Sequence, residues 1–310
     1  MNQSQKVLVA GTGLSGTAAA RLVLDRGGEV VLYDGNASLK EEEIKAKFDK
    51  EAKVSVVLGE IKRSDLLGVE LCIISPGIPL DSPFVAVVDD AKIPILGEIE
   101  LAYQCSLGRL AAITGTNGKT TTTALTGEIL KAKYEETFVV GNIGDPYTSR
   151  VLEMTEDSVT VAEVSSFQLE FIKDFCPRAA VILNITPDHI ERHHTMERYV
   201  AAKARIFENM GKDNCLLLNA EDEYTPILMK KAKNTTVCLF SISRDVEEGA
   251  CLNGADLVIK RRGKVLKVAG IDELQLTGNQ NYQNVLAAAF LAYEGGIPLE
   301  AIHDGIIEFK

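Results

Sequence analysis

The chain has 310 residues, 46% of them hydrophobic and 25% charged, a composition typical of a globular protein of two domains. Its formal net charge of −11 argues against a nucleic-acid partner, which would need a basic face. The six cysteines lack the paired spacing of a zinc site or disulfide framework. No apolar run reaches the roughly 18 residues of a membrane helix, and the N-terminus does not resemble a signal peptide. We therefore expect a cytoplasmic protein that has no membrane contact.

The first motif is a glycine loop near the N-terminus. Residues 6–10 predict a buried strand that runs into GTGLSG at 11–16, and a helix is expected after the loop. A second strand, at 30–33, ends at Asp34. Glycines, a helix N-terminus and an acid beyond the second strand are typical of a site for a nucleotide diphosphate. NAD is the obvious occupant, another nucleotide diphosphate fits the loop equally well, and the alternative is an ordinary turn.

The rest of the first hundred residues predicts a small parallel sheet. Residues 40–52 predict an exposed helix, and 54–58 and 71–74 predict two further strands. The second of these runs into SPGIP at 75–79, a rigid turn at the carboxyl end of a strand, where open α/β sheets bind ligands. Residues 93–109 are expected to form a linker and a short helix.

A second glycine loop follows the apolar run at 110–113, which predicts another strand. The loop residues are Gly115, Thr116, Asn117, Gly118, Lys119, Thr120 and Thr121. In such a loop backbone N–H groups bind phosphates, Lys119 reaches the outer phosphates and the Thr120 hydroxyl can ligate Mg²⁺. The longer form of the motif has a glycine where Ile113 stands, so an ordinary turn is the alternative. Its position between a buried strand and an amphipathic helix favours a phosphate loop.

The predicted strands at 137–140, 159–164 and 179–184 end in polar residues. Glu163 lies near the end of the second strand, and His189 follows the third. Such groups at the carboxyl ends of neighbouring strands could hold a metal ion beside the phosphates. A buried glutamate in an internal pair and a histidine that merely packs are the alternatives.

The last third predicts more helices and strands. Thr195 is the expected N-cap of a helix that carries Lys203, which is either an interfacial lysine or a functional one. The asparagine-rich run at 278–284 either caps the next helix or reads the edge of a base. Strands are expected at 215–219 and 237–241, and a hairpin at 257–260 and 264–268.

These elements predict an α/β protein of two domains. We expect residues 1–97 to form a Rossmann-like domain. Residues 98–310 are expected to form a P-loop-type central domain with a mostly parallel sheet flanked by helices.

Eight stretches resemble the motifs of one enzyme family and occur in its order. They are GTGLSG (11–16), SPGIP (75–79), TGTNGKTT (114–121), GNIG (141–144), EVSSFQLE (163–170), NITPDHIER (184–192), YVAAKARIFEN (199–209) and GNQNYQN (278–284). The chain thereby resembles the Mur ligase family, and within it the members that add D-glutamate. The resemblance implies an ATP-dependent amide ligase of peptidoglycan synthesis. ATP phosphorylates the L-alanyl carboxylate of UDP-N-acetylmuramoyl-L-alanine, and the amine of D-glutamate then displaces the phosphate.

The resemblance also assigns residues to roles. Lys119, His189 and Lys203 would act in catalysis, with a carbamate on Lys203. Thr120 and Glu163 would hold one Mg²⁺ and His189 a second. Asn281 and Asn284 would face the adenine, in addition to the phosphate-loop residues. The substrate-binding residues would be Asn142 and Ser165 for the muramyl part and Leu14, Ser15, Asp34, Ser75, Pro76 and Gly77 for the uridine diphosphate.

Some positions depart from the family pattern. Val140 replaces a common glycine, and Glu191 stands where aspartate is common. Family members continue into a third domain, so we expect a monomeric fragment that binds the UDP-substrate, binds ATP weakly and turns over little or nothing. A competing hypothesis is an NAD-binding or non-catalytic protein that uses the first glycine loop. A second phosphate loop with metal-bearing strand ends favours the ligase.

Overall fold

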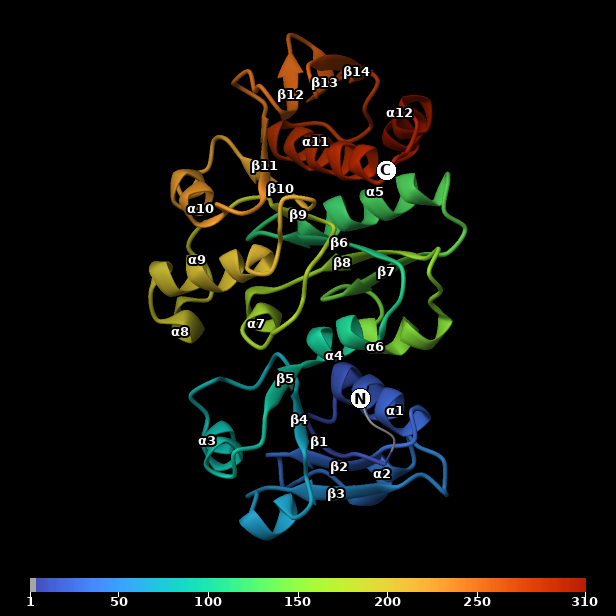
Figure 1. The fold of residues 1–310 in the computed structure, drawn as a ribbon, viewed down its shortest axis with the longest axis vertical. Helices are drawn as coiled ribbons and strands as arrows, with labels where there is room; N and C mark the ends of the chain where they lie inside the picture. Colours follow the sequence, from blue (N-terminus) through green and yellow to red (C-terminus); the bar gives the residue numbers. More distant parts are fainter. Residues whose placement is uncertain (1–3) are drawn as a thin grey trace. The chain divides into compact units, whose positions relative to one another are not determined.

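The computed structural model describes residues 4–310, and these form two compact units. Unit 1 comprises the chain up to Ser106 together with Asp145–Glu153 and Phe167–Phe175, and unit 2 comprises the remainder. Neither unit is one continuous stretch of chain, as the colours of Figure 1 show. The domain division after residue 97 stays a prediction. No helix within residues 4–310 is long and apolar enough to cross a bilayer.

Unit 1 contains a five-stranded parallel sheet in the order β3-β2-β1-β4-β5. Its strands are β1 (Lys6–Ala10), β2 (Glu29–Asp34), β3 (Val54–Leu58), β4 (Leu71–Ile74) and β5 (Ile95–Gly97). Its helices include α1 (Leu14–Asp25), α2 (Glu41–Lys45), α3 (Pro83–Asp90), α4 (Glu98–Cys105) and α6 (Tyr147–Arg150). The order reverses at β1, so the carboxyl ends of β1 and β4 lie side by side. The Rossmann-like prediction is confirmed.

One prediction for unit 1 is wrong, and a second is only partly right. The helix expected over 40–52 ends at Lys45, and turns follow. Lys47 donates from Nζ to the carbonyl of Thr12 instead of pairing along a helix, and Phe48 is only partly buried. The residues after Lys45 therefore bury too little apolar surface to stabilise further helical turns. Over residues 93–109 the expected short helix is present as the buried α4, but the part expected to be a linker contains the strand β5. A strand of three residues leaves too short a pattern to recognise.

Two buried glutamates of α4 hold the later segments in unit 1. Glu100 accepts hydrogen bonds from the backbone N–H groups of Lys173, Asp174 and Phe175. Glu98 accepts from the N–H and hydroxyl of Thr148 at 2.7 Å each, and burial raises the pKa of its carboxyl group. These contacts explain why the segments Asp145–Glu153 and Phe167–Phe175 belong to unit 1.

Unit 2 is built on a nine-stranded sheet in the order β14-β13-β12-β11-β10-β9-β6-β8-β7. Neighbouring strands from β7 to β12 are parallel, and β13 and β14 are antiparallel, which confirms the expected mostly parallel sheet. The strands are β6 (Arg109–Thr114), β7 (Thr137–Gly141), β8 (Val159–Glu163), β9 (Ala179–Ile182), β10 (Cys215–Asn219), β11 (Thr236–Ser241), β12 (Gly249–Asn253), β13 (Asp256–Arg261) and β14 (Lys264–Gly270).

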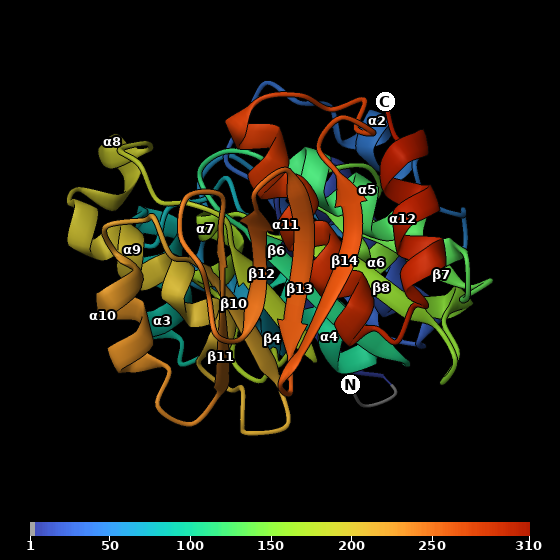
Figure 2. The ribbon, with the colours of Figure 1, turned by 90° about the horizontal axis from the view of Figure 1, so that it is seen from above.

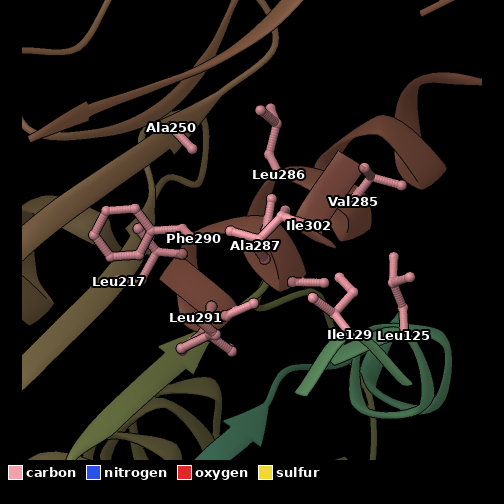
Figure 3. Close-up of a cluster of buried hydrophobic side chains, with 14 of the residues drawn as sticks. Leu125, Ile129, Leu217, Ala250, Val285, Leu286, Ala287, Phe290, Leu291 and Ile302 are labelled. Carbon is pink, nitrogen blue, oxygen red and sulfur yellow. The ribbon is translucent and has the colours of Figure 1, made fainter. Parts of the chain in front are cut away.

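Helices pack on this sheet through a continuous apolar core. They are α5 (Lys119–Lys131), α8 (Ile190–His193), α9 (Met196–Ala204), α10 (Thr225–Lys231), α11 (Asn279–Glu294) and α12 (Leu299–Glu308), while the short α7 (Ser166–Leu169) begins where unit 2 passes into unit 1. Figure 2 shows α11 and α12 beside the strands β12–β14. In Figure 3, Leu125 and Ile129 of α5 lie near Val285 and Ile302 of α11 and α12. The core therefore fixes α11 against the helix that follows the phosphate loop.

Candidate functional site

The site is organised by the strand order of unit 2. β6 pairs with β9 on one side and with β8 on the other, and all three strands are parallel. The loops after these strands therefore begin at one edge of the sheet, where open α/β sheets bind ligands. The loop after β6 leads to Lys119 at the start of α5, β8 ends at Glu163, and the loop after β9 leads to His189.

The loop after β6 needs its two glycines. Gly118 has a φ of +85°, and α5 begins immediately after it. A Cβ on Gly118 would lie 2.2 Å from Oδ1 of Asn284, and a Cβ on Gly115 would lie 2.9 Å from the Cβ of Leu183. The backbone therefore curves tightly around the start of α5, with its N–H groups near a helix N-terminus, as in phosphate loops.

Two residues without an assigned role anchor this loop. Oδ1 of Asn184 accepts from the backbone N–H of Asn117 at 2.8 Å, and Nδ2 of Asn184 donates to the backbone carbonyl of Asn117 at 3.0 Å. The buried Tyr199 lies with its hydroxyl 3.1 Å from that of Thr116. Both residues lie within the family-like motifs, and Asn184 is the first polar residue after a buried run. Sequence spacing alone does not connect them to the loop, because the contacts span 67 and 83 residues.

Two lysines direct their ammonium groups at loop carbonyls. Lys119 donates to the carbonyl of Thr116 at 2.9 Å, and Lys203 donates to that of Gly115 at 2.8 Å. Lys203 is 2% exposed and packs over the ring of Tyr199. Burial lowers the pKa of Lys119, while Glu163 and Asp188 oppose the shift. Burial and the charge of Lys119 lower the pKa of Lys203 to about 7, which leaves a large share of its amine neutral at neutral pH.

Glu163 connects the loop to the neighbouring strands. One carboxylate oxygen accepts from the hydroxyl of Thr120 at 2.9 Å, and the other accepts from the side-chain amide of Asn142 at 2.9 Å. Glu163 is 2% exposed. A threonine hydroxyl and a carboxylate at this distance are oxygen ligands of the kind that Mg²⁺ prefers, so these residues fit a magnesium ion beside phosphates.

His189 lies on an exposed turn before α8 and has a φ of +52°. Its ring contacts the carboxylates of Asp188 at 3.4 Å and Glu191 at 3.8 Å. Within residues 4–310, no three His, Cys, Asp or Glu side chains form a cluster able to hold a metal by themselves. The role of His189 in a second metal site stays a prediction.

Two further residues of the prediction lie on α11. Asn284 is 3% exposed and its amide lies against Gly118, so it borders the phosphate loop. Asn281 is partly buried and donates to the carbonyl of Thr277 at 2.9 Å. Ser165 follows β8 within two residues of Glu163. The binding roles of these three residues stay predictions.

In unit 1, the first glycine loop and the SPGIP turn meet. A Cβ on Gly11 would lie 2.4 Å from Oγ of Ser75, and Leu14 at the start of α1 is 81% exposed. Asp34 accepts from both the N–H and the hydroxyl of Thr12. Burial opposes ionisation of Asp34, but the hydrogen bonds of Thr12 and Asn36 outweigh it and lower the pKa. Ser15, Pro76 and Gly77 belong to the same two loops.

A mostly parallel sheet, a glycine loop ending in Lys119 and Thr120, and a strand-end carboxylate define a P-loop enzyme that acts on a nucleotide. The sequence model of the Mur ligase middle domain matches residues 113–292, and that of the Mur ligase MurD-like N-terminal domain matches residues 5–97. The chain belongs to the Mur ligase family of ATP-dependent amide ligases, which confirms the assignment from the motifs.

Close relatives carry the same family assignment, and solved structures share the fold. UDP-N-acetylmuramoylalanine–D-glutamate ligases of Lachnoclostridium phytofermentans and Lachnospira eligens are each 44% identical over 99% of this chain, which spans 67% and 68% of their lengths. The UDP-N-acetylmuramate:L-alanyl-gamma-D-glutamyl-meso-diaminopimelate ligase of Neisseria meningitides has a similar fold, with a TM-score of 0.66, 16% identity and coverage of 99% and 98% of the two chains. A murein peptide ligase of Psychrobacter arcticus has a TM-score of 0.60 at 16% identity, over 99% of this chain and 68% of its own.

Proposed function

We propose that the chain takes part in peptidoglycan synthesis by adding D-glutamate to UDP-N-acetylmuramoyl-L-alanine with ATP. The observation that carries this proposal is the convergence of Lys119, Lys203 and the Thr120–Glu163 pair at one edge of the sheet. The 44% identity to two ligases named for this reaction supports the choice of substrates.

The reaction follows from the chemistry of the two substrates. An amide does not form readily from a carboxylate, because an oxide ion is a poor leaving group. Attack of the L-alanyl carboxylate oxygen on the γ-phosphorus of ATP forms an acyl phosphate and releases ADP. The amine of D-glutamate then attacks the acyl carbon, the carbon–oxygen bond to phosphate breaks, and the nitrogen loses a proton. Phosphoryl transfer of this kind depends on positioning and on neutralisation of charge.

The phosphate loop supplies both requirements. Its backbone N–H groups and the ammonium of Lys119 would bind the β- and γ-phosphates. Thr120 and Glu163 would hold Mg²⁺, which supplies positive charge to the phosphate oxygens when bound. Asn281 and Asn284 would border the nucleotide from α11, and His189 would hold a second ion.

Lys203 is suited to carry a carbamate. Because its pKa is lowered to about 7, the neutral amine can bond to the carbon of CO₂ with release of a proton, which turns a cation into an anion. We expect ¹³C-bicarbonate to give a carbamate carbon resonance in the wild-type chain and none in Lys203→Arg. The same resonance in both proteins would contradict this role.

Unit 1 would bind the uridine diphosphate. The glycine loop at 11–16, the N-terminus of α1 and the turn at 75–77 offer backbone N–H groups to a diphosphate. Asn142 and Ser165 of unit 2 would contact the muramyl part.

The six thiols are all free, in keeping with a reducing cytoplasm.

A comparison of two ligands tests the proposed function. UDP-N-acetylmuramoyl-L-alanine and NADH are titrated separately into the same 310-residue chain by calorimetry. We expect saturable binding of the UDP-sugar and no binding of NADH, with Ser75→Ala and Asp34→Ala weakening the first. Binding of NADH without binding of the UDP-sugar would contradict the proposal and favour a redox protein.

A further inference from the structure

The start of α11 is held by a residue that lies far from it in the sequence. Gly278 precedes the helix with a φ of +97°, and no side chain caps it. Gln283 instead donates from Nε2 to Oε2 of Glu221 at 2.7 Å. Glu221 lies two residues after β10, so this contact ties the first turns of the helix to the carboxyl edge of the sheet.

Glu221 is itself held firmly. Its other oxygen, Oε1, accepts from the hydroxyl of Ser241 at 2.8 Å and from the N–H groups of Ile242 and Ser243 at 2.9 and 2.8 Å. Four donors therefore surround one partly buried carboxylate. A carboxylate with this many donors is a rigid acceptor, and hydrogen bonds to an ionised group are stronger than neutral ones.

The residue after Gln283 is Asn284, whose amide lies against Gly118 of the phosphate loop. Rotation of the first two turns of α11 would move this amide relative to Gly118. The Gln283–Glu221 hydrogen bond opposes that rotation, because it fixes the side chain of Gln283, the residue before Asn284, to a carboxylate outside the helix.

We propose that Glu221 is a positioning residue for the nucleotide: through Gln283 it sets the first two turns of α11 and so keeps Asn284 against the phosphate loop. This rests on the proposed binding of ATP. Glu221 acts through Gln283 and needs no contact with the nucleotide.

An exchange of donor and acceptor tests the proposal. Gln283→Glu places two carboxylates together, and we expect the affinity for Mg²⁺ and a non-hydrolysable ATP analogue to fall about tenfold. In the double variant E221Q/Q283E the new glutamine can donate to the new glutamate, so affinity should return toward the wild-type value. A protein that is merely destabilised would not recover in this way. Glu248→Gln is the matched control, since Glu248 is a partly buried carboxylate with arginine donors on another loop, and its affinity should be unchanged.

Hydrogen exchange of peptides covering 115–121 supplies a second readout that needs no nucleotide. We expect faster exchange in Gln283→Glu and recovery in the double variant. Failure of the wild-type chain to bind the analogue would remove the proposed function, and the exchange data would still decide this inference. Wild-type exchange and affinity in Gln283→Glu, or absence of recovery in E221Q/Q283E, would overturn it.

Discussion

At the scale of single residues, Glu163 joins three segments of the site. It accepts from Thr120 of the phosphate loop and from Asn142 after β7, and it lies at the end of β8. A carboxylate with both oxygens engaged is oriented before any ligand arrives, which reduces the cost of arranging a metal site. The two hydrogen bonds also satisfy the carboxylate oxygens of this buried acid, which would otherwise be costly to bury.

Glu163→Gln tests the assignment of the metal ligand. The amide keeps the shape of the side chain but offers a weaker ligand, so affinity for an ATP analogue with Mg²⁺ should fall about tenfold or more. Affinity in EDTA should change little. Glu136→Gln is the control, because Glu136 also accepts two side-chain hydrogen bonds, from the hydroxyls of Ser158 and Thr155, away from the loop. Equal affinities of Glu163→Gln and wild type in Mg²⁺ would show that Glu163 is not a ligand.

His193 predicts a pH dependence of stability. It is 4% exposed and lies 2.9 Å from Oγ of Ser166, and burial with nearby cations lowers its pKa from 6.5 to about 4. The unfolded chain therefore binds more protons between these values, so stability falls as the pH drops from 6.5 to 4. Each pKa unit corresponds to about 1.4 kcal/mol.

Urea unfolding across this pH range provides the measurement. His193→Gln should flatten the loss of stability in acid. His303→Gln should not, because the pKa of His303 is raised by its bonds to Asp304 and Glu273 and its contribution has the opposite sign. An unchanged acid slope in His193→Gln would refute the role of this histidine.

At the scale of elements, α4 shows how a short helix can organise distant chain. Glu100 is fully buried and accepts three backbone N–H groups from residues 173–175. Glu100→Ala leaves these donors without their acceptor, and we expect the free energy of unfolding to fall by about 3 kcal/mol. Glu43→Ala removes an exposed pair with Lys40 and should cost less than about 0.5 kcal/mol. Equal unfolding free energies for the two variants would contradict this account.

The sequence predicts elements well where an apolar run ends at a turn. The predicted bounds of β1, β3, β4 and β10 match the structure, because each strand is a short run of apolar or β-branched residues beside loop signals. The sequence does not predict β12, since GACLN has neither alternation nor a long apolar run. Lys119, Thr120 and Glu163 could be found from motif and strand-end position. Asn184, Tyr199 and Glu221 could not, because their roles arise from contacts between distant residues.

At the scale of the whole molecule, the chain passes repeatedly between its two compact units. Phe171, from one of the later segments, lies in the apolar core of unit 1, and its carbonyl accepts from the N–H of Gly97. The first sheet therefore depends on residues that follow the phosphate loop in sequence. A domain defined by sequence order alone would omit them.

A fragment of residues 1–97 tests this dependence. It lacks α4 and Phe171, so we expect a loss of cooperative unfolding and of near-ultraviolet circular dichroism relative to the full chain. The full chain under the same conditions is the reference. A fragment with a sharp transition and full near-ultraviolet signal would show that the later segments are dispensable for the fold of unit 1.

The central claim is that Lys119 and the loop at 115–121 bind the phosphates of ATP with Mg²⁺. Calorimetric titration of a non-hydrolysable ATP analogue into wild type and Lys119→Ala, each with Mg²⁺ and with EDTA, tests it most directly. We predict saturable binding to the wild type that requires Mg²⁺ and is weakened about tenfold to a hundredfold in Lys119→Ala. Equal binding by both proteins, or binding indifferent to Mg²⁺, would contradict the claim.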